Sequence, residues 1–233
     1  MSKIYQASLL QALVSGYYDG VISVSELKRN ADVAIGTFLG ADGELIMVDN
    51  IVYKAKVDGK IEVAMDDELI PFCNGANFKK DYALKVKCKN ISELKEKLNV
   101  FYKKYNNMFM VIKINGLFKG ITVRSLPKQT KPYKSLDYIV EHEQKVYSYN
   151  DIYGTVIGFK APSFMNNLNT TDYHMHFIDM DKLLGGHVLD ISFDEIEVLI
   201  SIKREFNLIL PNEIEFNTKN FLIDKELVKK VEE

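Results

Sequence analysis

The chain is poor in the features that mark exported, membrane-spanning or nucleic-acid-binding proteins. Its 233 residues include only two cysteines, Cys73 and Cys88, which could pair in principle. The N-terminus lacks the basic start, apolar stretch and cleavage site of a signal peptide, so we expect both cysteines to be reduced core thiols. No apolar run reaches the roughly 18 residues of a membrane span. The 30 basic and 32 acidic residues are interleaved, so the sequence has no basic stripe of the kind that binds nucleic acid. We therefore expect a cytoplasmic protein that binds neither a membrane nor a nucleic acid.

What is present is an ordinary globular composition dominated by strand-forming segments. Hydrophobic residues make up 47% of the chain, whose length fits one large domain or two tightly joined lobes. Runs rich in Val, Ile, Phe and Tyr and bounded by Gly, Asn, Asp or Pro predict strands. These strands are expected at residues 44–56, 82–88, 108–114, 154–159 and 173–178.

Helical patterns are fewer and shorter. Ser23 and Glu26 have the spacing of a capping box. Leu94, Leu98 and Phe101 recur at helical spacing. Helices are therefore expected at about residues 23–29, 92–104 and 136–147, and within the first dozen residues. Strands in runs with irregularly placed helices favour an α+β fold with mixed or antiparallel sheets.

The histidines carry the most specific pattern. Only four occur in the chain, and three of them lie within 14 residues. His174 and His176 occupy alternate positions of a predicted strand, so both imidazoles project from one face. A polar stretch and a glycine pair then lead to His187, which opens a second strand-like run. If the two runs form a hairpin turning near Asp181, His187 returns beside His176 on the adjacent strand.

Three imidazoles on one sheet face predict a zinc site. Three protein ligands leave the metal an open position, which is typical of catalytic sites. A single histidine on a strand is more often an ordinary hydrogen-bonded residue, and a His-x-His pair alone is often fortuitous. The third histidine after a glycine turn favours a metal site formed by His174, His176 and His187. The fourth histidine, His142, lies in a charged helical stretch and is expected to be solvated.

Two prolines and a polar cluster between residues 124 and 132 mark the best internal boundary. We predict an N-terminal β-rich lobe at residues 1–123 and a C-terminal zinc-binding lobe at residues 124–233. The two lobes are expected to pack together as a single family domain, with the zinc site on a β-hairpin of the second lobe.

Several motifs, taken in order along the chain, resemble those of the alpha-acetolactate decarboxylases. The histidine signature His174-Met175-His176-Phe177-Ile178, followed by Gly185-Gly186-His187-Val188-Leu189-Asp190, is similar to the metal signature of that family. Other similar elements are Gly16-Tyr17-Tyr18-Asp19-Gly20, Gly36-Thr37-Phe38, Asp42-Gly43-Glu44, Arg124-Ser125-Leu126-Pro127-Lys128-Gln129, Pro132-Tyr133 and Gly154-Thr155-Val156-Ile157-Gly158-Phe159. Together they cover essentially the whole chain. Asp172 and Asn50 depart from the family pattern, since glycine is common at both positions.

The resemblance implies a zinc-dependent enzyme that converts 2-acetolactate to (R)-acetoin and carbon dioxide, with the metal stabilising an enediolate intermediate. It implies that Arg124 binds the substrate carboxylate or a developing oxyanion, and that Glu44 lies beside the metal. It also implies that a glutamate of the C-terminal tail, best matched by Glu232 with Glu233 as the fallback, enters the pocket as a proton donor. Thr37 is expected to line the pocket and contact the substrate. The resemblance further implies a homodimer.

Two other classes of function fit the histidine pattern. One is a different three-histidine zinc lyase or hydrolase that uses a metal-bound hydroxide as its nucleophile. The other is a non-enzymatic protein in which zinc staples the sheet. That second reading requires a closed coordination sphere with a fourth protein ligand, such as Asp179 or Asp190, and unfolding when the metal is removed.

Overall fold

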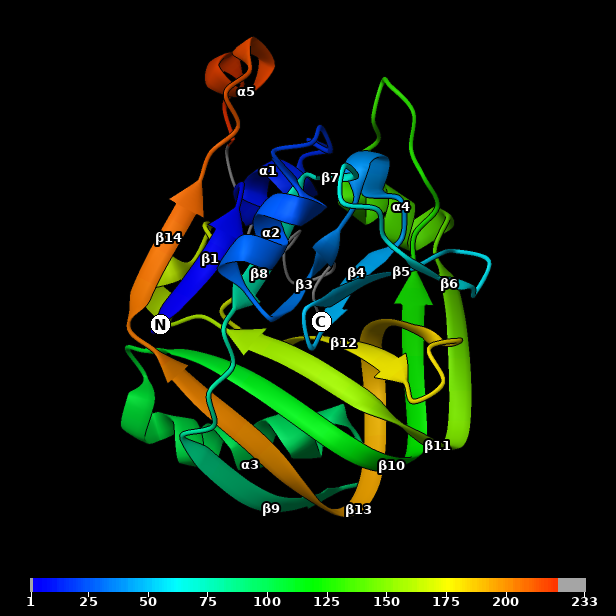
Figure 1. Cartoon of the computed structure of the whole chain (residues 1–233), viewed down its shortest axis with the longest axis vertical. Helices are drawn as coiled ribbons and strands as arrows, with labels where there is room; N and C mark the ends of the chain where they lie inside the picture. The colour runs from blue at the N-terminus through cyan, green and yellow to red at the C-terminus, as the bar shows by residue number, and fades with distance from the viewer. Residues whose placement is uncertain (1, 222–233) are drawn as a thin grey trace.

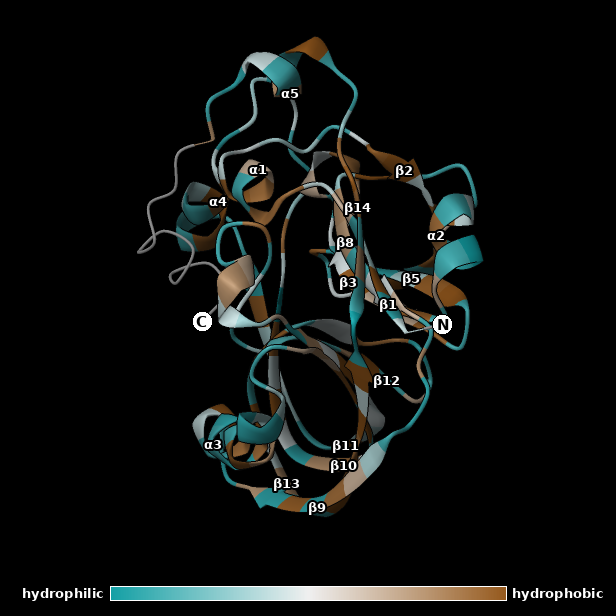
Figure 2. Cartoon of the chain, turned by 90° about the vertical axis from the view of Figure 1, so that its left-hand side faces the viewer, coloured by the Kyte–Doolittle hydropathy of each residue, from teal (hydrophilic) through white to brown (hydrophobic). Residues whose placement is uncertain are grey.

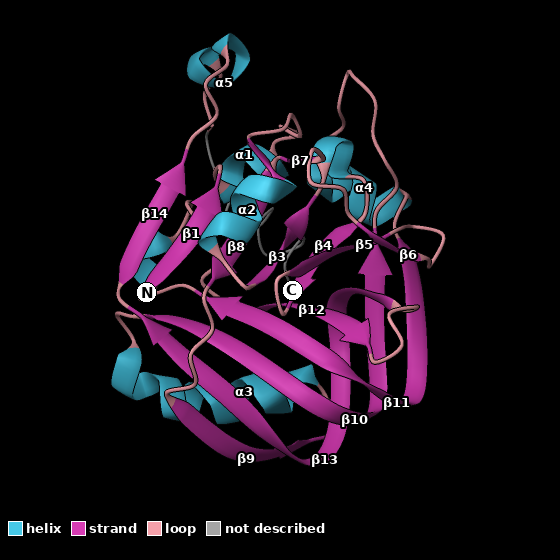
Figure 3. Ribbon diagram, in the orientation of Figure 1, coloured by secondary structure: helices cyan, strands magenta, loops and turns pink. Residues whose placement is uncertain are grey.

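The computed structural model describes residues 2–221 and consists mainly of two β-sheets, one above the other, with short helices around them (Figures 1 and 3). The upper sheet in Figure 1 has seven strands and the lower sheet has five. This arrangement confirms the predicted α+β class and the two packed lobes.

The seven-stranded sheet has the order β14-β1-β8-β3-β4-β5-β6. Its strands are β1 (Lys3–Ala7), β3 (Val33–Thr37), β4 (Glu44–Val48), β5 (Ile51–Ala55), β6 (Ile61–Val63), β8 (Phe72–Ala76) and β14 (Glu205–Ile209). Strand β14 runs parallel to β1 while the other neighbours are antiparallel, so the sheet is mixed. A separate two-stranded sheet pairs β2 (Ile22–Ser23) with β7 (Leu69–Ile70).

The five-stranded sheet is antiparallel and closes on itself. Its strands are β9 (Tyr82–Cys88), β10 (Phe109–Ser125), β11 (Lys145–Lys160), β12 (His174–Asp179) and β13 (Gly185–Lys203). The order is β10-β11-β12-β13-β9, and an additional pairing between β10 and β13 completes a ring of four strands. Figure 2 shows this curvature, with α3 (Ile91–Tyr102) outside the ring.

Three apolar clusters hold these layers together. One fills the closed sheet with residues such as Phe118, Val188 and Phe193. A second lies between the two sheets, and a third packs the seven-stranded sheet against α2 (Val24–Asn30). Strand β4 shows why both faces of its sheet are covered. Alternate side chains of a strand point to opposite faces, so Ile46 enters the inter-sheet cluster and Leu45 enters the cluster beneath α2.

The predicted helices are present with altered limits. Ser23 caps α2 by accepting a hydrogen bond from the Glu26 amide at 3.2 Å, as the capping box predicts. The helix expected at 136–147 is α4 (Leu136–His142), and the expectation for residues 145–147 was wrong because they begin β11. The first dozen residues contain β1 and then α1 (Leu10–Val14). Within residues 2–221, the remaining helix is α5 (Ile214–Thr218), and three short 3-10 turns cover Leu39–Ala41, Lys103–Tyr105 and Ser163–Met165.

The segment expected as one strand at 44–56 folds into β4 and β5. Asp49 and Asn50 form the turn between them, with φ angles of 51° and 66°. Asp and Asn tolerate this left-handed conformation better than most residues, although glycine accepts it most readily. The turn therefore explains why asparagine can replace the glycine that is common at position 50.

The sheets divide the chain at different places from the expected boundary. Residues 123 and 124 both lie inside β10. The seven-stranded sheet takes its strands from residues 3–76 and 205–209, and the five-stranded sheet from residues 82–203. Cys73 and Cys88 are buried free thiols, as predicted. Among residues 2–221, no helix is long and apolar enough to cross a lipid bilayer. The dimer stays a prediction.

Candidate active site

The three clustered histidines lie on the β12–β13 hairpin, as predicted. His176 faces His187 across the antiparallel pair, and the strands are joined by residues 180–184. The buried carboxylate of Asp179 shapes this turn by accepting hydrogen bonds from three backbone amides, those of Leu183 and Leu184 at 2.7 Å and Asp181 at 3.2 Å. One aspartate therefore provides hydrogen-bond acceptors for three backbone amides of the turn that separates the two strands.

A glycine is required where β13 begins. Gly186 has a φ of +154°, and a Cβ atom there would lie 2.5 Å from the Arg124 carbonyl oxygen. Any larger residue would push β13 away from β10. The close approach brings Arg124 directly opposite His187 in the β10–β13 pairing. The glycine pair of the sequence motif thus joins the histidine hairpin to the strand that carries the arginine.

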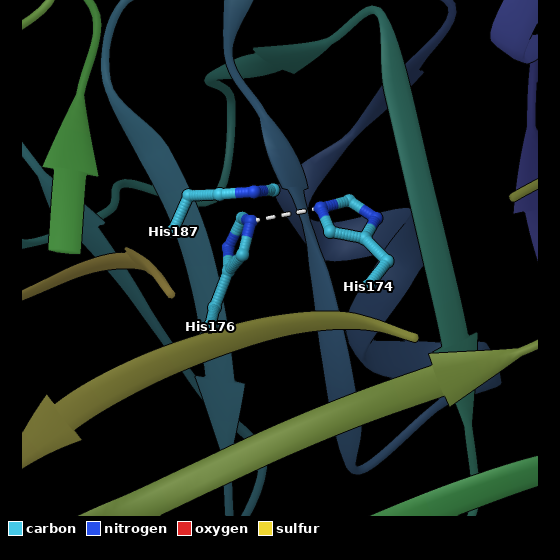
Figure 4. A group of neighbouring side chains, drawn as sticks. All are labelled: His174, His176 and His187. Carbon is cyan, nitrogen blue, oxygen red and sulfur yellow. Dashed lines mark hydrogen bonds between the residues drawn. The ribbon is translucent and has the colours of Figure 1, made fainter. Parts of the chain in front are cut away.

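The imidazoles converge on one point (Figure 4). One potential ligand atom from each of the three rings lies within 4.8 Å of the others, and His174 Nε2 is 3.0 Å from His176 Nε2. Burial, with a smaller contribution from the Arg124 guanidinium, lowers the pKa of His174 to about 3. Burial is also the main cause that lowers the pKa of His176 and of His187 well below the usual value. All three rings are therefore neutral at physiological pH, which is the form that ligates a metal.

These residues fit a divalent metal ion. His176 Nδ1 donates a hydrogen bond to the Leu45 carbonyl oxygen at 2.9 Å, which leaves the lone pair of Nε2 directed at the cluster. The Nε2–Nε2 separation of His174 and His176 is close to the spacing of two imidazole ligands that share one ion at about 2.0–2.1 Å. The three-histidine donor set is thus preorganised for a cation.

The seven-stranded sheet contributes Glu44 and Thr37, which face each other across β3 and β4. Glu44 Oε2 lies 3.6 Å from His176 Nε2, and both side chains are buried. The Thr37 hydroxyl donates to the Gly43 carbonyl oxygen at 2.7 Å, so its own proton is already used. Gly43 has a φ of +76°, which favours glycine, and the turn that contains it leads directly into Glu44.

One pocket collects these groups. Its polar lining is formed by Thr37, Glu44, Arg124, His174 and His187. Arg124, from β10, is only 4% exposed, so its charge acts within a largely water-free environment. The structure therefore brings the predicted Arg124, Glu44 and Thr37 to the histidine cluster. Their roles stay predictions, and Glu232 lies outside the described residues.

Asp179 and Asp190, the fourth ligands that a structural zinc site would use, form hydrogen bonds with backbone amides instead. The Asp179 carboxylate binds the hairpin turn, and Asp190 Oδ1 accepts a hydrogen bond from the Ile91 amide at 2.8 Å. Within residues 2–221, the group able to hold a metal contains the three histidines and no carboxylate. That composition does not favour a closed structural site.

The apolar side of the pocket was not anticipated from the sequence. It is lined by Leu13, Gly36, Ala41, Phe72, Leu126 and Leu136. These residues come from six separate places along the chain, and an apolar residue carries no mark of such a role. Gly36 is required on β3 because a Cβ there would lie 2.2 Å from the Phe72 carbonyl oxygen.

Known proteins are similar to this chain in both sequence and fold. The family model described as alpha-acetolactate decarboxylase matches residues 4–222. The alpha-acetolactate decarboxylase of Bacillus licheniformis is 36% identical over 221 residues, covering 95% of this chain and 87% of that protein. That of Methanosarcina mazei is 34% identical over 232 residues, covering 97% and 80%. The crystal structure of alpha-acetolactate decarboxylase from Bacillus subtilis strain 168 has a TM-score of 0.94 at 33% identity and covers 99% of each chain. This chain belongs to the alpha-acetolactate decarboxylase family.

Proposed function

We propose that this protein decarboxylates 2-acetolactate to (R)-acetoin and carbon dioxide, with zinc held by His174, His176 and His187. The observation that carries the proposal is a single pocket that joins neutral histidines able to bind a metal to a buried arginine and a buried glutamate. Relatives named alpha-acetolactate decarboxylase are similar to this chain along almost its whole length, which supports the choice of substrate. Neither a hydrolase nor a structural-zinc protein explains this combination as well.

The reaction requires stabilisation of negative charge. 2-Acetolactate carries a carboxylate and a hydroxyl on the carbon next to a ketone. When the bond to the carboxylate breaks, its electron pair delocalises onto the ketone oxygen. A divalent cation held by His174, His176 and His187 would supply Lewis-acid stabilisation of this negative charge, and zinc suits three imidazole ligands.

Arg124 orients the carboxylate in this proposal. Its planar guanidinium matches a carboxylate or an oxyanion, and its burial strengthens the attraction. Holding the carboxylate out of the plane of the ketone aligns the breaking bond with the carbonyl π-system, so the electron pair can delocalise. Thr37 can accept a hydrogen bond from the substrate hydroxyl, because its own proton is donated to Gly43.

Glu44 is the described carboxyl group best placed to deliver the proton. It is 5% exposed and lies beside His176, in the same pocket as Arg124. Protonation of the planar intermediate from one face yields one enantiomer of acetoin. Glu232 is the second candidate, assigned by family resemblance alone.

The test is to supply racemic 2-acetolactate to the purified protein and to measure acetoin and its chirality. The same assay is run on chelator-treated protein, on chelator-treated protein reloaded with zinc, and on the His176→Ala variant. We expect (R)-acetoin from the untreated protein, at least about a 1000-fold loss in the stripped and His176→Ala samples, and recovery with zinc. The metal content of each sample is measured in parallel. A folded, zinc-loaded protein that makes no acetoin would refute the proposal, and ester hydrolysis and carbon dioxide hydration would then be assayed.

A further inference from the structure

The pocket has two chemically distinct sides. The polar side is formed by His174, His187, Arg124, Glu44 and Thr37, and the apolar side by side chains including Leu13, Phe72 and Leu136. The apolar residues belong to one buried cluster, so this side is packed as a core. A ligand that meets both sides needs its oxygens on one edge and its alkyl groups on the other.

Two leucines of this apolar side come from short helices that pack together. Leu13 lies in α1 and Leu136 is the first residue of α4. Both are almost fully buried, at 6% and 4% exposed. Their neighbours one turn away, Leu10 and Ile139, belong to the same apolar cluster but do not line the pocket. Each helix therefore has one side chain that lines the pocket and a comparable one that only packs in the core.

We propose that Leu13 and Leu136 set the upper size of the alkyl groups that the enzyme accepts. This inference rests on the proposed function. The substrate class is then the short-chain 2-hydroxy-2-alkyl-3-oxo acids, whose carboxylate, hydroxyl and ketone oxygens engage the polar side. The two alkyl groups diverge from that edge toward the leucines. Selection is steric, because this side offers hydrophobic contact and no hydrogen bond that distinguishes a methyl from a longer chain.

The expected size of the effect follows from the volume removed. Replacing leucine by alanine removes three carbon atoms, which leaves room for a longer alkyl group. A single methylene in a hydrophobic pocket changes kcat/KM by about 10–200-fold. The 2-propyl homologue of 2-acetolactate carries an n-propyl group in place of the methyl group on C2. We therefore expect Leu136→Ala and Leu13→Ala each to raise the kcat/KM for this homologue, relative to that for 2-acetolactate, by at least about 10-fold.

The experiment measures this ratio in the zinc-loaded full-length protein and in matched variants. The substrates are 2-acetolactate and its 2-ethyl and 2-propyl homologues, and release of carbon dioxide is followed. The controls are Ile139→Ala and Leu10→Ala, which create comparable cavities in the same cluster away from the pocket lining. They should alter stability while changing the substrate ratio by less than about 3-fold. Leu136→Val is included because it removes less volume, and it should move the ratio in the same direction.

Two results would overturn the inference. One is an unchanged ratio in the active pocket variants, and the other is an equal change in Ile139→Ala and Leu10→Ala. Both are distinct from failure of the proposed function, in which the wild-type protein would not decarboxylate 2-acetolactate at all. If the alanine variants do not fold, the ratio in Leu136→Val decides the question.

Discussion

Two hairpins meet at the active site, and they differ in how much of the site each contains. The β12–β13 hairpin carries all three histidines of the candidate metal cluster within 14 residues, and its turn is held by Asp179 from the same hairpin. The β3–β4 hairpin carries Thr37 and Glu44 but reaches the histidine cluster only because the two sheets pack together. That packing depends on an inter-sheet cluster that includes Ile46 and Ile178.

The difference indicates that the two hairpins have separate functions. The histidine hairpin can assemble its ligand set from local sequence, so metal binding is expected to depend mainly on β12 and β13. The handling of protons is expected to depend on β3 and β4. A polar link between them is the His176 imidazole, which donates to the Leu45 carbonyl oxygen and lies beside Glu44. Variants of each hairpin should therefore separate metal affinity from turnover.

Among the variants that separate the two hairpins, the largest effect is expected from Glu44→Gln. The substitution keeps the shape of the side chain but removes the acidic proton, and general acid catalysis contributes about 10²–10⁴-fold to a rate. We expect kcat to fall by about that factor while one metal ion per chain is retained. Acetoin formation and metal analysis of the same preparation measure the two quantities.

Glu62→Gln is the matched control, since Glu62 is an exposed glutamate on β6 of the same sheet and pairs with Lys56. It should leave both quantities unchanged. Loss of the metal together with activity in Glu44→Gln would contradict the division between the hairpins, because Glu44 would then belong to the metal-binding unit. A kcat within about 5-fold of wild type would assign the proton to another group.

The same contrast explains what the sequence allowed us to predict. The histidine hairpin was predictable because its spacing, its glycine pair and its alternation are local, and its facing residues follow from strand geometry. The positions of Glu44 and Arg124 beside it came from family resemblance, since they lie on β4 and β10 and meet the histidines only through sheet packing. Spacing along the chain carries no information about that contact.

Other features could not be inferred for related reasons. Closure of the five-stranded sheet depends on the long β10–β13 pairing, which joins residues up to 94 positions apart, Phe109 and Lys203. The α4 limit was missed because Lys145, Val146 and Tyr147 continue a plausible helical pattern, but their pairing with β10 favours the strand. The apolar lining of the pocket is made of ordinary core residues, so only the tertiary structure reveals it.

A smaller effect, on metal affinity, is expected from Asp179→Ala. The change leaves three backbone amides of the hairpin turn without their acceptor, which should lower the free energy of unfolding by about 1–3 kcal/mol. His176 and His187 flank this turn, so we expect metal affinity to fall by about 10–100-fold, as for other residues that orient ligands. The kcat at saturating metal should stay within about 3-fold of wild type. Competition with a chromophoric chelator and urea denaturation measure these changes.

The control for the turn is Asp181→Ala, which removes an exposed carboxylate two residues away. Its metal affinity should match that of wild type. If Asp179→Ala lowers kcat at saturating metal as strongly as Glu44→Gln does, the hairpins are not separable. Unchanged metal affinity in a destabilised Asp179→Ala protein would show that the ligands hold their positions without the turn.

The smallest effect is expected from Thr37→Val, and its value lies in the choice between two roles for the hydroxyl. The substitution preserves side-chain shape but removes the hydrogen bond to the Gly43 carbonyl oxygen, which precedes Glu44. If the hydroxyl acts by fixing Glu44, kcat should fall by about 10-fold at unchanged KM, whereas direct substrate binding would raise KM instead. Thr37→Ser retains the hydroxyl and should restore most of the loss. We expect the kcat effect, because the hydroxyl donates its only proton to Gly43 and so fixes the residue that precedes Glu44. Its oxygen can still accept a hydrogen bond from the substrate, so a rise in KM would reveal that second role. Steady-state kinetics of both variants at saturating zinc measures the two constants.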